Sequence, residues 1–206
     1  MRIKICGLFR EQDIDYVNEA RPDYAGFVFA KSKRQVSAPL AQYLRFRLVD
    51  SIVPVGVFVN APIAEVAALY HNGTISIAQL HGEEDEGYIL QLKKKCETNN
   101  KQAQFRVIKV IKSEGLKNKI PATTADYLLI DSGAGTGKSF NWELLNPQKI
   151  EKPWFLAGGV NLDNIKQAMA LNPFAVDISS GAETDGMKDR EKILQLVTMV
   201  RKGNIQ

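Results

Sequence analysis

Cysteine and histidine are scarce in this 206-residue chain, which has two of each. Two cysteines, Cys6 and Cys96, are too few for the disulfide framework on which small secreted domains rely. His71 and His81 stand too far from them along the chain for the short ligand spacings of a zinc site. The composition therefore predicts neither a disulfide-stapled fold nor a metal centre, and we expect no cofactor.

Long hydrophobic runs and a strong charge imbalance are also missing. No stretch approaches the roughly 18 apolar residues of a membrane span, and the N-terminal segment lacks the length and cleavage pattern of a signal peptide. We therefore expect a cytoplasmic protein that does not bind membranes. The net charge is only +4 and the basic runs are short, which favours a small anionic ligand over nucleic acid.

What the chain does contain is a series of short apolar segments rich in β-branched residues. Eight can be counted: Ile3–Gly7, Tyr24–Ala30, Val53–Asn60, Ile75–His81, Phe105–Ile111, Tyr127–Asp131, Trp154–Gly158 and Phe174–Ser179. Most are nearly continuous hydrophobic runs, a pattern typical of parallel strands that are covered on both faces.

Helix-like stretches separate these segments. They are Asp13–Ala20, Pro39–Leu48, Pro62–Tyr70, Glu84–Cys96, Leu162–Leu171 and Asp189–Lys202, with weaker signals over Ser113–Lys119 and Trp142–Leu145. Ser37 and Asn161 are suitable N-cap residues for two of them. Regular alternation predicts an α/β fold with a parallel sheet, and eight strands predict a closed (β/α)8 or TIM barrel that forms a single domain over residues 1–206. A doubly wound open sheet is the alternative.

Small residues follow the last two predicted strands, in Ala157-Gly158-Gly159-Val160 and Ser179-Ser180-Gly181. Such loops let backbone N–H groups approach an anion, and the loops after strands seven and eight hold phosphate in many barrels. The same residues can also serve only to make tight turns. Because the two loops follow neighbouring strands, we predict a phosphate site there, formed by Gly158, Gly159, Ser180 and Gly181.

A third glycine-rich segment, Asp131–Ser139, follows the sixth predicted strand. It is not a Walker A loop, because Ser132 occupies the place of the first glycine. Lys138 likewise occupies the last glycine position of a GxGxxG pattern. We expect this segment to act as a lid over a bound ligand.

Two reactive side chains end predicted strands, where barrel enzymes place their active sites. Cys6 ends the first strand; it is either a small buried hydrophobe or a catalytic thiol. Strand alternation puts Lys4 on the same face, where its charge would lower the pKa of the thiol. Asp131 ends the sixth strand, either as a capping residue or as a general acid.

Four further polar residues are candidates for the same pocket. Arg34 follows the second strand and is either a solvated surface charge or a fork for a substrate carboxylate. Gln79 and His81 share one face of the fourth strand, and Asp177 shares a face with Ser179 on the eighth. For Gln79, His81 and Asp177, a purely structural role is an equally good interpretation.

Taken together, the motifs resemble the phosphoribosylanthranilate isomerase family of tryptophan biosynthesis. The matching segments are Lys4-Ile5-Cys6-Gly7, Gly26-Phe27-Val28-Phe29 with Ser32-Lys33-Arg34, Val55-Gly56-Val57-Phe58-Val59-Asn60, Gln79-Leu80-His81-Gly82, Leu129-Ile130-Asp131, Gly135-Thr136-Gly137-Lys138, Ala157-Gly158-Gly159-Val160 and Val176-Asp177-Ile178-Ser179-Ser180-Gly181. Any one of them is a weak signal, but their joint order along the chain is specific.

The resemblance implies a (β/α)8 barrel that needs no metal or cofactor and catalyses an Amadori rearrangement of N-(5-phosphoribosyl)anthranilate. It implies that Asp131 is the general acid and Cys6 the general base. Arg34 would hold the anthranilate carboxylate of the phosphosugar substrate, and the glycine loops its phosphate. We expect a monomer, with a homodimer as the alternative. Another sugar-phosphate isomerase and a non-catalytic phosphometabolite-binding barrel are the alternative functions.

Overall fold

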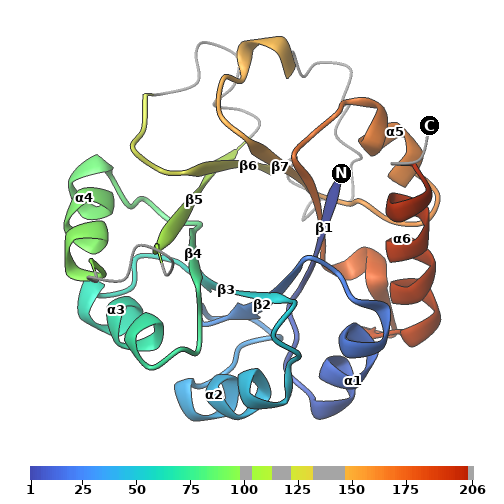
Figure 1. Cartoon of the computed structure of the whole chain (residues 1–206), viewed down its shortest axis with the longest axis horizontal. Coiled ribbons are helices and arrows are strands. Elements are labelled where there is room, and N and C mark those ends of the chain that lie inside the picture. Colours follow the sequence, from blue (N-terminus) through green and yellow to red (C-terminus); the bar gives the residue numbers. More distant parts are fainter. Residues whose placement is uncertain (98–103, 113–121, 132–146, 204–206) are drawn as a thin grey trace.

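The computed structural model describes residues 1–97, 104–112, 122–131 and 147–203. Its main feature is a closed barrel in which eight parallel strands follow one another in chain order, β1 pairing with β8 to complete the ring (Figure 1). The strands are β1 Arg2–Cys6, β2 Tyr24–Val28, β3 Val53–Phe58, β4 Ile77–Leu80, β5 Arg106–Lys112, β6 Tyr127–Asp131, β7 Trp154–Ala157 and β8 Ala175–Ile178. The predicted eight-stranded barrel is therefore confirmed, and the open sheet is not formed.

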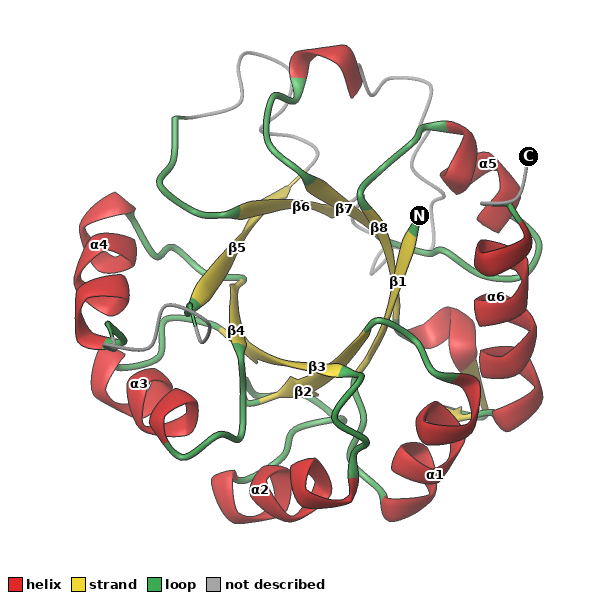
Figure 2. Cartoon of the chain, in the orientation of Figure 1, coloured by secondary structure: helices red, strands yellow, loops and turns green. Residues whose placement is uncertain are grey.

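The helices surround the barrel on its outside (Figure 2). In the described part of the chain they are α1 Glu11–Ala20, α2 Ala38–Arg47, α3 Ile63–His71, α4 Glu86–Lys95, α5 Ile165–Ala170 and α6 Arg190–Lys202. All six correspond to predicted stretches. The predicted helical segments Ser113–Lys119 and Trp142–Leu145 lie outside the described residues.

Helix starts follow the local capping chemistry, with one correction. Ser37 caps α2 as predicted, its side chain accepting a hydrogen bond from the Leu40 N–H at 3.3 Å. Asn161 does not cap α5, which begins only at Ile165. Instead, the side chain of Asn161 accepts from the Asp163 N–H at 2.9 Å and closes a local turn before the helix.

Alternation along the strands divides the apolar residues into two regions. Ile3 and Ile5 of β1 point outward into the layer between the barrel and its helices. The residues that alternate with such outward groups fill the barrel, among them Val55, Tyr127 and Phe155. Lys4 and Cys6 therefore point into the barrel, toward its interior and its mouth.

A short antiparallel hairpin, β9 Glu183–Thr184 and β10 Met187–Lys188, lies between β8 and α6 and was not predicted. Asp185 and Gly186 form its turn with φ angles of 51° and 78°. An Asp-Gly pair with both φ values positive is the signature of a tight type I′ hairpin turn. The dipeptide was therefore a sequence signal for this hairpin, although the flanking strands are too short to show alternation.

None of the helices in the described residues is both long enough and apolar enough to cross a membrane.

Candidate active site

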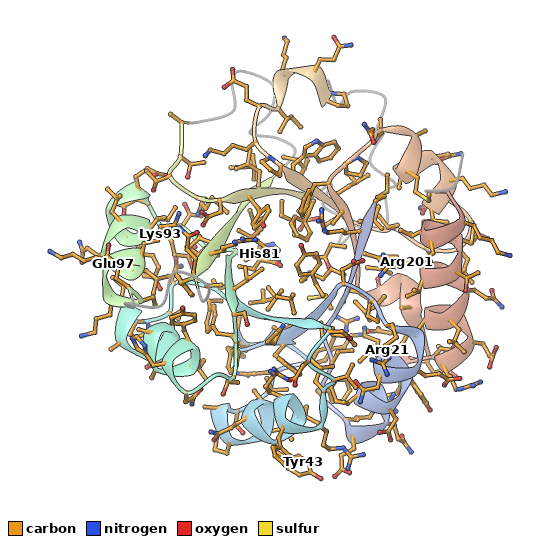
Figure 3. The ribbon with its side chains drawn as sticks, viewed as in Figure 1. Arg21, Tyr43, His81, Lys93, Glu97 and Arg201 are labelled. Carbon is orange, nitrogen blue, oxygen red and sulfur yellow. The ribbon has the colours of Figure 1, made fainter. Side chains whose placement is uncertain are left out.

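The reactive side chains lie at the carboxyl ends of the barrel strands. Cys6 ends β1, His81 directly follows β4 and Asp131 ends β6. Because all eight strands are parallel, these positions share one mouth of the barrel, the end at which barrel enzymes build their active sites. Figure 3 shows the His81 side chain within the ring of strands.

The Cys6 thiol is buried, and its place depends on Gly26 of the neighbouring strand β2. A Cβ on Gly26 would lie 2.7 Å from the Cys6 Sγ, so the bare backbone of β2 makes room for the sulfur. Burial raises the pKa of the thiol, while the charge of Lys4 and its hydrogen bond to the thiol oppose that rise. Lys4 therefore acts on the thiol pKa in the expected direction, but desolvation outweighs the lysine and the net pKa is raised.

Lys4 and Asp177 form a buried ion pair beneath the thiol. The Lys4 Nζ donates to both carboxylate oxygens of Asp177, at 2.9 and 3.0 Å. Burial alone would lower the pKa of Lys4, but the charges of Asp177 and Cys6 outweigh it, and the pKa is raised. The lysine is therefore kept charged inside the barrel, within hydrogen-bonding range of Cys6.

Asp131 and His81 approach each other across the mouth from β6 and β4. The His81 Nε2 lies 3.4 Å from the Asp131 Oδ2, and the two side chains are 32% and 24% exposed. Both side chains are therefore accessible to a ligand while they contact each other. Below them, Gln79 is only 3% exposed, and within the described residues its Oε1 accepts no hydrogen bond.

Arg34 reaches the mouth from the loop after β2 and does not stand free in solvent. Its Nε and Nη2 donate to the two carboxylate oxygens of Glu183, each at 2.6 Å. The Arg34 side chain passes beside Gly7, the residue after Cys6, where an added Cβ would lie 2.5 Å from the Arg34 Cδ. Glu183 is thus a bidentate partner of Arg34 that the sequence did not suggest.

The two predicted phosphate loops contact each other at the ends of the neighbouring strands β7 and β8. Gly158 and Gly159 have φ angles of 91° and 74° after β7. Ser180 begins a 3-10 turn, Ser180–Ala182, after β8. A Cβ on Gly181 would lie 1.9 Å from the Val160 carbonyl oxygen, so the two loops meet through bare backbone.

Sequence reasoning missed two buried charged residues of the β9–β10 hairpin. Glu183 is 8% and Lys188 4% exposed. The Lys188 Nζ donates to Glu183 Oε1 at 2.5 Å and to the Ser179 carbonyl oxygen at 3.0 Å. The Asp185-Gly186 turn signal would have placed the hairpin, but not its contact with Arg34. The predicted lid beyond Asp131 lies outside the described residues.

Comparison with known proteins identifies the family. The family model described as N-(5'phosphoribosyl)anthranilate (PRA) isomerase matches residues 3–199. The N-(5'-phosphoribosyl)anthranilate isomerase of Endomicrobium trichonymphae is 46% identical over 208 residues, covering 97% of this chain and 98% of its own.

Solved structures of the same family are also similar to this chain. TrpF from Jonesia denitrificans has a TM-score of 0.83 and 31% identity, covering 99% of this chain and 98% of its own. A phosphoribosyl anthranilate isomerase in complex with reduced 1-(o-carboxyphenylamino)-1-deoxyribulose 5-phosphate has a TM-score of 0.76 and 28% identity, covering 98% of this chain and 99% of its own. Similarity of sequence and fold over nearly the whole length shows that the chain belongs to the N-(5'-phosphoribosyl)anthranilate isomerases, enzymes of tryptophan biosynthesis.

Proposed function

We propose that the barrel mouth isomerises N-(5'-phosphoribosyl)anthranilate with Asp131 as general acid and Cys6 as general base. The observation that carries this assignment is the position of both groups at strand ends of one mouth, Cys6 on β1 and Asp131 on β6. An isomerisation needs one acid and one base and leaves no net redox change.

The reaction begins at the sugar ring. Asp131 gives its proton to the furanose ring oxygen, the bond from that oxygen to C1 breaks, and a Schiff base forms. The Cys6 thiolate then removes the proton from C2, which gives an enolamine. Tautomerisation of the enolamine yields the ketone, 1-(2-carboxyphenylamino)-1-deoxyribulose 5-phosphate.

Two anionic ends anchor the substrate around this chemistry. The backbone of the loops around Gly158, Gly159, Ser180 and Gly181 holds the phosphate, and Arg34 holds the anthranilate carboxylate. Binding at both ends orients C1 and C2 between the acid and the base.

Loss of fluorescent phosphoribosylanthranilate, measured without added metal or cofactor, tests the assignment. Cys6→Ser and Asp131→Asn should each lower kcat by about two to four orders of magnitude, while inorganic phosphate still binds. Cys96→Ser is the matched control, because Cys96 is also buried but caps α4 on the outside of the barrel. Full activity of Asp131→Asn would overturn the acid assignment. Growth of a tryptophan auxotroph lacking this step tests the function in the cell.

We further propose that the chain works as a cytoplasmic monomer folded as one domain over residues 1–206, acting on a small phosphosugar and not on nucleic acid or membranes. The residues assigned above all come from a single chain, so no second copy is needed to complete the site. Sedimentation equilibrium distinguishes the monomer from a homodimer, and cell fractionation tests the location.

A further inference from the structure

We propose that Glu183 is a positioning residue that fixes the orientation of Arg34 and ties it to the phosphate loop. The inference rests on the proposed function, in which Arg34 holds the substrate carboxylate. It adds a residue of the β9–β10 hairpin to the machinery of substrate recognition.

The first observation is how Arg34 uses its donors. A guanidinium has five N–H groups. Two of them, one on Nε and one on Nη2, are taken by the two carboxylate oxygens of Glu183 at 2.6 Å each. Two parallel hydrogen bonds fix the plane of the guanidinium as well as its position. The opposite fork, made by Nη1 and the second N–H of Nη2, is then the edge that meets a substrate carboxylate.

The second observation is how firmly Glu183 is held. Its side chain is 4% exposed and accepts a third hydrogen bond, from the Lys188 Nζ at 2.5 Å. Its backbone carbonyl accepts from the Lys192 Nζ at 2.6 Å. Burial alone would raise the pKa of Glu183, but the hydrogen bonds from Arg34 and Lys188 outweigh it and the pKa is lowered. Glu183 is therefore a fixed carboxylate and not a mobile stand-in for the substrate.

The third observation is where this network leads. Glu183 directly follows the Ser180–Ala182 turn, and Lys188 also donates to the Ser179 carbonyl oxygen at 3.0 Å. On its other side, the stem of Arg34 crosses Gly7, where an added Cβ would lie 2.5 Å from the Arg34 Cδ. The hairpin thus joins the phosphate loop to the arginine, and the arginine to the backbone beside Cys6.

The charges of this cluster favour an anion. Arg34 and Lys188 bring two positive groups to the single carboxylate of Glu183. The three side chains together therefore carry one positive charge more than they carry negative charges. A rigid cation at a fixed distance from the phosphate loop selects a substrate with anions at both ends.

Two ligands that differ only in the carboxyl group measure what that group contributes to binding. We would measure the Kd of reduced 1-(o-carboxyphenylamino)-1-deoxyribulose 5-phosphate and of the same compound without its carboxyl group, and compare their ratio among variants. Glu183→Gln should lower this preference for the carboxylate by about ten- to hundredfold, while the compound without the carboxyl group and inorganic phosphate bind almost as before. Glu183→Asp, which keeps the charge, should restore part of the preference. Thr184→Ala is the control, because it removes the hairpin hydrogen bond to Asp189 without touching Arg34.

Each outcome has a distinct meaning. An unchanged ratio in both Glu183 variants would overturn the positioning role and leave the function of Arg34 intact. A ratio that rises in Glu183→Gln would mean that Glu183 competes with the substrate, which also overturns it. An unchanged ratio in Arg34→Met would instead reject Arg34 as the carboxylate ligand, and this inference with it. If Glu183→Gln does not fold, Glu183→Asp is compared with the double variant Arg34→Met, Glu183→Asp. If the losses of carboxylate preference in the two single variants simply add up in the double variant, the proposal is overturned.

Discussion

The ammonium of Lys4 lies 2.9 Å from the Asp177 carboxylate, inside the barrel and directly below the Cys6 thiol. Neither partner is more than 8% exposed, so both charges have been removed from water. A buried pair of this kind contributes little net stability, but an unpaired member is costly. The pair therefore provides a fixed positive charge beside the thiol without leaving a buried charge uncompensated.

Removing one partner of this pair should destabilise the protein strongly. Lys4→Met leaves the Asp177 carboxylate buried and unpaired, and we expect a loss of about 3–5 kcal/mol in the free energy of unfolding. The double variant Lys4→Met, Asp177→Leu should recover a large part of that loss. Urea denaturation followed by circular dichroism measures both. Losses that simply add in the double variant would contradict the coupling.

Activity should depend on pH through the thiol. The base we propose is the Cys6 thiolate, and burial disfavours that form and raises the pKa of Cys6. Because the thiolate forms as the pH rises, kcat/KM should increase with pH, with a midpoint above the ordinary thiol pKa of about 8.5. Lys4→Met removes a charge that favours the thiolate and should move the midpoint to still higher pH.

Alkylation by iodoacetamide in a Cys96→Ser background gives an independent measure of the same pKa. Mass spectrometry at a series of pH values follows the modified thiol. If kcat/KM and the alkylation of Cys6 both increase with a midpoint below pH 8, the raised pKa is contradicted.

The contact between His81 and Asp131 should matter to the acid step. If Asp131 is the general acid that we propose, a hydrogen bond from His81 would stabilise the carboxylate that remains after proton transfer. We expect His81→Asn to lower kcat by about ten- to hundredfold, the value of a hydrogen bond to a charged group. His71→Asn is the control, because that ring is on the surface, where its Nε2 lies 3.1 Å from the Lys95 carbonyl oxygen of α4. Equal kcat values for the two histidine variants would reject a role for His81.

Gly26 should be needed for the position of the thiol. The Cβ of Gly26→Ala would lie 2.7 Å from Cys6 Sγ, so the sulfur must move. Gly56→Ala is a matched control, since its Cβ would lie 2.7 Å from a ring atom of Phe58 in the outer layer. Both should lose about 1–3 kcal/mol of stability by overpacking, but only Gly26→Ala should lose turnover. Loss of turnover in both would point to a general effect of barrel distortion.

The barrel, its mouth and most of its candidate residues could be predicted because they follow from local patterns. The continuous apolar segments predict the number of strands, and the residues at their ends predict which side chains face the mouth. Cys6, His81 and Asp131 were accessible in this way. The resemblance to a family added roles to positions that alternation had already brought to one end.

What could not be predicted depends on contacts between distant segments. Glu183 binds Arg34 across 149 positions, and no local pattern links them. The direction of the Cys6 pKa shift also depends on the closed barrel. A lysine two residues away is visible in the sequence, but the desolvation that outweighs it is visible only once the surrounding strands are in place.

Closure of the ring between β1 and β8 has a consequence for the growing polypeptide. The ribosome makes Lys4 173 positions before Asp177, and Arg34 149 positions before Glu183. A chain translated as far as β7 already carries Cys6, Asp131 and Arg34, yet it lacks both the carboxylate that pairs with Lys4 and the one that binds Arg34. Termination before β8 should therefore yield no partly active enzyme, since the charge network is completed only by residues of β8 and β9.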